Sequence, residues 1–141
     1  MEHPTKLILG AKSQHLKGKK IALCVTGSAA AIEAPKIARE LIRHGAEVFG
    51  VMSLAAQKVI HPEILEFGTG NPVVTELTGK LEYIQLAGEH ANKVDLVLIA
   101  PATANTISKI ACAIYDTPVV AVASTAFGSR IPVGTSKRVI L

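Results

Sequence analysis

The sequence predicts an α/β domain built on a doubly wound parallel sheet, with helices on both faces and therefore three layers. Short apolar runs alternate with helical patterns, which is the arrangement that gives parallel strands joined by crossover helices. Aromatic residues make up only 4% of the 141 residues. The apolar content is mostly Ala, Val, Ile and Leu, the usual material of such sheets. The length allows one domain with a substantial core.

Four apolar runs are predicted to be strands, because each is short and followed by turn residues. A parallel strand that is covered on both faces is typically a continuous apolar run. The predicted strands are residues 21–25, 47–52, 96–100 and 119–123, and a further strand is expected to begin at 131–133.

The clearest helix is predicted over residues 30–42, where apolar residues recur on one face. Gly45 follows as the natural C-terminal cap. Pro35 lies inside this pattern and removes a backbone hydrogen bond, so we expect a kink or a distorted first turn. Further helical segments are expected at 54–60, 63–67, 82–91 and 104–113, with a small-residue loop at 124–126.

The net charge of +4 and the pI of about 9.2 favour an anionic ligand. The densest basic patch holds only Lys17, Lys19 and Lys20. Aromatic residues do not interleave with this patch, so no nucleic-acid partner is expected. No membrane span is expected either, because no apolar run approaches about 18 residues.

The two cysteines, Cys24 and Cys112, are expected to be buried small hydrophobes, since neither has partners at metal or disulfide spacing. The N-terminus lacks the layout of a signal peptide, which together with the free cysteines indicates a cytoplasmic protein. Residues 1–20 form an N-terminal extension whose apolar patch at 7–9 can pack on the domain or on a neighbouring subunit. Residues 21–141 are expected to form a single domain that is truncated at its C-terminus.

Polar side chains gather where the predicted strand 96–100 runs into a helix. Pro101 ends the strand, because proline cannot donate to a sheet ladder. Thr103, Asn105 and Thr106 then stand where the first N–H groups of a helix need partners. Ligands of open α/β sheets bind at such carboxyl ends of strands. The spacing alone equally suits a capped helix with no ligand.

Two other strand ends favour a phosphate group. Gly27 and Ser28 follow the first strand, where small residues let backbone N–H groups approach a phosphate. Ser53 ends the second strand, where a dinucleotide-binding domain needs an acidic residue for the ribose. Each end taken alone also suits an ordinary turn. Together they favour a mononucleotide phosphate over NAD.

Residues 101–106, Pro-Ala-Thr-Ala-Asn-Thr, resemble the Pro-Ala-Ser-Ala-Asn-Thr motif of the flavin-dependent cysteine decarboxylases. The flanks are similar to the phosphopantothenoylcysteine decarboxylase domain of archaeal bifunctional coenzyme A biosynthesis proteins. The similarity extends from the N-terminus to Pro132 and includes the segments 3–6, 25–28 and 40–48.

This resemblance implies a Rossmann-like flavoprotein fold with FMN as cofactor. It implies a lyase that oxidatively decarboxylates a phosphorylated cysteinyl small molecule in coenzyme A biosynthesis. It also implies a homotrimer, or a multiple of trimers, with the flavin at the subunit boundary. By position, Gly27, Ser28 and Ser53 would hold the FMN phosphate. The residues that would line the flavin, or close over it as a loop, are Ala102, Thr103, Asn105, Thr106, Ser124, Thr125 and Ala126.

Tyr83 stands where the resemblance implies a catalytic histidine, in Tyr-Ile-Gln-Leu instead of His-Ile-x-Leu. Tyrosine has an ordinary pKa of about 10 against about 6.5 for histidine, so it is a far poorer base at neutral pH. His90 lies about 10 Å further along a helix and would not substitute. By their positions in the matching motifs, the resemblance implies that Tyr83 and Asn105 are the catalytic residues.

Two further departures concern a substrate-contacting segment and the turn after the helix 104–113. The family's Pro-x-Met-Asn/His segment, expected after Val133, is absent, and Ala-Ile-Tyr-Asp at 113–116 replaces a Gly-Ile-x-Asp run. Three functions therefore stay open: an FMN-dependent decarboxylase, a non-catalytic flavin-binding assembly protein, and a flavin prenyltransferase. The match to the archaeal proteins argues against the last.

Overall fold

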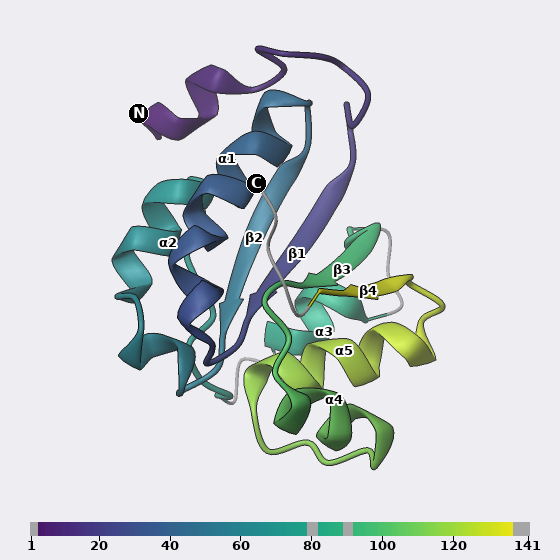
Figure 1. The fold of residues 1–141 in the computed structure, drawn as a ribbon. Coiled ribbons are helices and arrows are strands. Elements are labelled where there is room, and N and C mark those ends of the chain that lie inside the picture. The colour runs from purple at the N-terminus through teal and green to yellow at the C-terminus, as the bar shows by residue number, and fades with distance from the viewer. Residues whose placement is uncertain (1–2, 79–81, 89–91, 137–141) are drawn as a thin grey trace.

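A computed structural model of the chain describes residues 3–78, 82–88 and 92–136. Within them, an all-parallel sheet has the strand order β2-β1-β3-β4 (Figure 1). The strands are β1 Lys20–Val25, β2 Glu47–Met52, β3 Leu96–Ile99 and β4 Val133–Thr135. The predicted parallel α/β sheet is confirmed.

Helices cover both faces of the sheet, which confirms the three predicted layers (Figure 1). They are α1 Ala34–Arg43, α2 Pro62–Thr69, α3 Glu82–Ala87, α4 Ala104–Ala111 and α5 Pro118–Gly128. Leu23 and Val25 of β1 belong to the core with α1 and α2. Ala22 and Cys24 belong to the opposite core with α3 and α5. β1 serves both cores because successive residues of a strand point to opposite faces.

The strand order reverses between β1 and β3, since the chain leaves β1 toward β2 and returns to the other side of β1. A crevice forms outside the carboxyl ends of the strands at such a reversal, and it is the usual ligand site of open α/β sheets. The fold thus places the predicted site at the ends of β1, β2 and β3.

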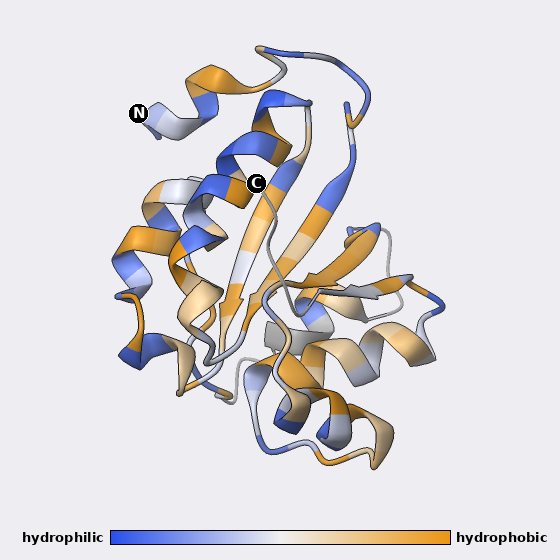
Figure 2. Cartoon of the chain, viewed as in Figure 1, coloured by the Kyte–Doolittle hydropathy of each residue, from blue (hydrophilic) through white to orange (hydrophobic). Residues whose placement is uncertain are grey.

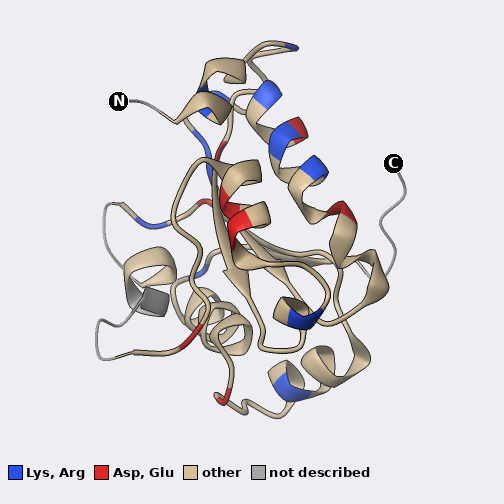
Figure 3. Ribbon diagram, turned by 90° about the vertical axis from the view of Figure 1, so that its left-hand side faces the viewer, with Lys and Arg blue, Asp and Glu red and all other residues tan. Residues whose placement is uncertain are grey.

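The first crossover shows the predicted distortion around Pro35. The segment before it, Ala29–Glu33, is a 3-10 helix, and Pro35 lies in the first turn of α1, where its missing N–H costs no helical bond. Gly45 follows α1 with φ +104, and a Cβ there would lie 2.8 Å from the Lys17 nitrogen. Figure 3 shows basic and acidic residues along α1.

The predicted strand at 119–123 is wrong, and so is the predicted loop at 124–126, because both segments lie in α5. Thr117 caps this helix by accepting a hydrogen bond from the Val120 N–H at 3.3 Å. The helix is buried over most of its surface, and Figure 2 shows its largely apolar composition. A short run buried all round has no period that separates a strand from a helix.

Smaller segments also differ from expectation. Of residues 54–60, only Ala56–Lys58 form a 3-10 helix. Cys24 is buried as predicted, but Cys112 is exposed, because it caps the end of α4 instead of lying on its inner face. The N-terminal 3-10 helix Pro4–Ile8 packs on the domain, where Thr5 donates to the Phe67 carbonyl of α2. Among the residues described, no helix has the length and apolar character needed to cross a membrane.

Candidate functional site at the carboxyl edge of the sheet

A cavity of about 490 Å³ lies at the carboxyl ends of the strands. Five residues predicted from sequence line it: Gly27 after β1, Ser53 after β2, and Thr103, Asn105 and Thr106 after β3. The remaining lining residues are Leu54, Ala55, Lys58, Lys109 and Thr117. Three separate strand ends therefore contribute to one cavity, as the fold predicts.

The hydroxyl of Thr26 joins the ends of β1 and β3. It donates to the Pro101 carbonyl oxygen at 2.6 Å and accepts from the Thr103 N–H at 3.0 Å. The Thr26 N–H donates to the same carbonyl at 3.3 Å. Thr26 is only 1% exposed, so water does not compete for these bonds. The backbone of 101–103 is thereby held against β1.

Thr103 forms the predicted cap of α4. Its hydroxyl accepts from the Thr106 N–H at 3.2 Å and lies 3.0 Å from the Thr106 hydroxyl. Thr106 is buried, whereas Asn105 is exposed in the same first turn. The Asn105 amide offers both donors and an acceptor at the cavity. The cap of α4 is made by the Thr103 side chain and does not use that of Asn105.

Gly27 is required by close packing rather than by an unusual backbone angle. A Cβ at this position would lie 2.4 Å from the Cβ of Ala55, closer than two non-bonded carbon atoms can approach. The loop after β1 and the turn after β2 are therefore in direct contact at the cavity wall. Any larger residue at position 27 must push the two loops apart.

Two serines at the strand ends use their hydroxyls as local caps. Ser28 accepts from the Ala30 N–H at 3.3 Å, and Ser53 accepts from the Ala56 N–H at 3.1 Å. A hydroxyl that accepts one bond still has a hydrogen to donate. Ser53 lines the cavity, and Ser28 does not.

Two lysines at the cavity were not predicted. Lys58 ends the 3-10 helix after Ser53 and makes no ion pair with another described residue. Lys109 pairs with Asp116 at 2.8 Å. Lys109 could have been found from the sequence, because it is one helical turn beyond Asn105 and so lies on the same face of α4.

Other predicted residues lie elsewhere. Ser124 and Thr125 are partly buried within α5 and do not line the cavity, and Ala102 is buried in the core beside α5. The backbone of Tyr83 lies in α3, and its side chain is outside what the structure describes. His90 lies outside the described residues.

The described residues hold no group of three His, Cys, Asp or Glu side chains placed to bind a metal. Burial raises the pKa of the Cys24 thiol to about 12. That thiol stays protonated at neutral pH and packs as an apolar side chain. The chemistry that the cavity offers is thus hydrogen bonding from amides and hydroxyls, with two cations nearby.

Comparison with known proteins identifies similar chains. Residues 9–135 match the family model described as Flavoprotein. The coenzyme A biosynthesis bifunctional protein CoaBC of Thermococcus kodakarensis is 65% identical over 127 residues, and that of Methanocaldococcus jannaschii 51% over 128 residues. These alignments cover 90% and 91% of this chain. The chain spans about a third of those relatives, 32% and 31% of their lengths.

A solved structure also shares the fold. The FMN-dependent cysteine decarboxylase SpaF superposes with a TM-score of 0.72 at 26% sequence identity. The match covers 85% of this chain and 68% of SpaF.

Proposed function

The chain belongs to the Flavoprotein family, and we propose that it binds FMN and is a decarboxylase of the phosphopantothenoylcysteine type, acting in coenzyme A biosynthesis. The observation that carries the proposal is the meeting of Gly27, Ser53, Thr103, Asn105 and Thr106 around one cavity. Both the CoaBC relatives and the FMN-dependent decarboxylase SpaF support it.

The cavity residues fit a flavin mononucleotide. The volume of about 490 Å³ is within the usual range for small-molecule sites. Gly27 lets the loop after β1 pack directly against Ala55 at the cavity wall, and the Ser53 hydroxyl has a hydrogen to donate. Lys58 adds a cation on this side of the cavity, where an anionic phosphate would be held. Thr103, Asn105 and Thr106 would contact the ring end of the cofactor.

FMN, when bound, supplies the two-electron oxidation that allows a cysteinyl carboxylate to leave as carbon dioxide. The protein's part is to bind and orient. The Asn105 amide N–H groups can hold the substrate carboxylate in place, and the Thr26 bonds fix the backbone from which Asn105 projects. The capping bond between Thr103 and Thr106 fixes the first turn of α4, which lines the cavity.

A second function is favoured by Tyr83, namely a flavin-binding protein without turnover. The family resemblance implies a histidine base at this position, and a phenol is protonated at neutral pH. In this alternative the chain binds FMN in the same cavity and does not release carbon dioxide.

We also propose that the chain assembles as a trimer or a multiple of trimers. The support is the family resemblance together with large apolar side chains that are exposed in the single chain, including Ile114, Tyr115 and Phe127. Light scattering after size-exclusion chromatography is expected to give a multiple of three times the 14.8 kDa chain mass. A monomeric mass would contradict this part of the proposal.

Two measurements test the function. Titration with FMN, followed by flavin absorbance and fluorescence, is expected to show saturable binding at one site per chain; no binding would overturn the proposal. Phosphopantothenoylcysteine is then added to the loaded protein, and carbon dioxide release is followed. Release supports the decarboxylase, whereas binding without release supports the non-catalytic alternative.

A further inference from the structure

A second cavity, of about 360 Å³, lies at the other edge of the sheet, at the amino ends of β1 and β2. Its lining shares no residue with the cavity that holds Gly27 and Asn105. β1 has six residues, so at 3.3 Å per residue the two cavities are about 20 Å apart. It is therefore separate from the proposed flavin site.

Basic residues surround this amino-edge cavity. Lys6, Lys19 and Lys20 line it, and Glu47 is its one acidic lining residue. None of the three lysines forms an ion pair with another residue that the structure describes. Three lysines against one glutamate give the lining a net positive charge, which favours a bound anion. Lys19 and Lys20 belong to the basic patch that the flavin site leaves unexplained.

The floor of the amino-edge cavity is apolar and rigid. Leu9 lines the cavity and is 56% exposed, so it supplies apolar surface that a ligand can reach, and Ile42, Ala46 and Val48 lie beneath it as part of the core under α1. Asn71 is buried beside them and donates to the Val48 carbonyl at 2.7 Å. Thr69 donates to the Asn71 carbonyl at 3.0 Å. These polar groups are satisfied within the protein, so they hold the wall in shape.

We propose that the amino-edge cavity binds a small amphiphilic anion. A carboxylate or phosphate group contacts the lysines, and a short apolar body lies against Leu9. An apolar floor selects against a purely ionic ligand, because burial of the ligand's apolar part contributes to binding. A nucleic acid is disfavoured, since no aromatic side chain lines the cavity to stack on a base.

Calorimetric titration of the whole chain with hexyl phosphate and with hexanoate tests the proposal. Saturable binding of at least one of the two is expected, and the two arms distinguish phosphate from carboxylate. Inorganic phosphate, which lacks the apolar body, and hexanol, which lacks the charge, should each bind at least about tenfold more weakly. Amide chemical shifts of Ala46 and Val48 should move with the same affinity.

The double variant Lys19→Gln/Lys20→Gln is expected to weaken binding by at least about tenfold. Lys17→Gln is the matched control, because Lys17 belongs to the same basic patch but does not line the cavity. The control should bind as the natural chain does. Absence of binding to both probes, equal binding by the double variant, or displacement of the bound probe by a short oligonucleotide would overturn the proposal.

Discussion

The Thr26 hydroxyl lies 2.6 Å from the carbonyl oxygen of Pro101 and donates a hydrogen bond to it. The two residues are 75 positions apart in the sequence. The bond therefore fixes the relative position of two chain segments that both reach the candidate flavin site. The same oxygen of Thr26 accepts from the Thr103 N–H, so one hydroxyl holds the backbone on both sides of Ala102.

Thr26→Val should separate this role from packing, because valine has the shape of threonine without the hydroxyl. The change leaves the Thr103 N–H without its buried partner and the Pro101 carbonyl with only the longer bond from the Thr26 N–H, which costs about 1–3 kcal/mol in free energy of unfolding. The FMN dissociation constant should rise about tenfold as the first turn of α4 loosens. Urea unfolding and FMN titration measure the two effects.

Thr26→Ser is the matched control for this prediction, since it keeps the hydroxyl and removes a methyl group. It should restore FMN affinity even if its stability stays below that of the natural chain. If the serine and valine variants bind FMN equally, the hydroxyl does not position the site.

Gly27→Ala is expected to destabilise the chain through contact with Ala55. The new methyl group would start 2.4 Å from the Ala55 Cβ, so the two loops must separate. Such overpacking costs about 1–3 kcal/mol in free energy of unfolding. FMN affinity should fall with it, because both loops form the cavity wall. Urea unfolding and FMN titration check the result.

A compensating change makes this prediction specific. Gly27→Ala combined with Ala55→Gly removes the methyl group that the first substitution meets. The double variant should lose less free energy of unfolding than the sum of the losses in the two single variants. Additive losses in the double variant would show that the contact between residues 27 and 55 is not the cause.

The position of Gly27, Ser53 and Thr103 at one site could be predicted from the sequence. Each follows a predicted strand, and parallel strands end at the same edge of a sheet. Lys58 could not be placed this way, because its direction depends on a short 3-10 turn after Ser53.

The end of the sheet was harder to predict from sequence. Residues 119–123 carry only small and branched apolar side chains, and in α5 they are buried by neighbours on nearly every side. Their pattern therefore has no polar face from which a helical period could be recognised. The stronger signal was the start of the helix, where Thr117 precedes Pro118, a capping residue followed by the residue favoured at a first helical position.

Lys58→Gln should reduce affinity for FMN and leave affinity for riboflavin unchanged. The substitution removes a cation proposed to lie near the phosphate, and riboflavin has no phosphate. A loss of about fivefold in FMN affinity is expected for one partly solvated charge pair. Lys36→Gln on α1 is the control, since Lys36 does not line the cavity. An equal loss for both flavins would mean that Lys58 contacts another part of the ligand.

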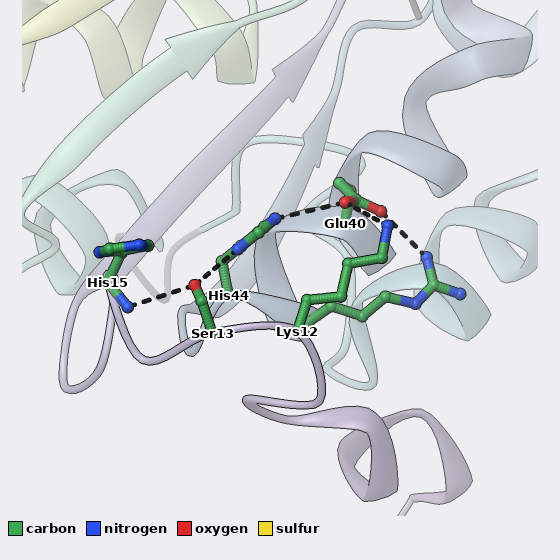
Figure 4. A network of polar contacts seen from close by, with 6 residues as sticks. Lys12, Ser13, His15, Glu40 and His44 are labelled. Atoms are coloured by element: carbon green, nitrogen blue, oxygen red, sulfur yellow. Dashed lines mark hydrogen bonds and ion pairs between the residues drawn. The ribbon is translucent and has the colours of Figure 1, made fainter.

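Glu40 should make stability depend on pH. Lys12 donates to its carboxylate at 2.8 Å, and Arg43 and His44 lie within 3.3 Å of it (Figure 4). The hydrogen bond from Lys12 is the largest cause that lowers the pKa of Glu40 below its ordinary 4.5, with smaller contributions from Arg43 and His44. Because the pKa of Glu40 is lower in the folded chain than in the unfolded chain, the ionised carboxylate stabilises the fold at pH values above its unfolded-state pKa. This stabilisation is lost as the pH falls through the folded-state pKa.

Glu40→Gln should therefore lower the melting temperature at pH 7, and the difference from the natural chain should shrink as the pH falls below about 4. Glu76→Gln is the control, because Glu76 is exposed and forms no ion pair with another described residue. Thermal unfolding at a series of pH values measures both. A difference that does not change with pH would show that the carboxylate charge contributes nothing.

Tyr83→His tests whether the residue at position 83 limits turnover. A histidine with an ordinary pKa of about 6.5 can accept a proton at neutral pH, whereas a phenol with a pKa of about 10 is already protonated. If the base is what limits the reaction, carbon dioxide release from phosphopantothenoylcysteine should rise by about 10²–10⁴-fold. FMN affinity should stay unchanged, since Tyr83 is not among the residues proposed to hold the cofactor. Tyr83→Phe is the matched control and should not raise turnover. No gain in the histidine variant, with FMN bound normally, would show that the residue at position 83 is not what limits turnover.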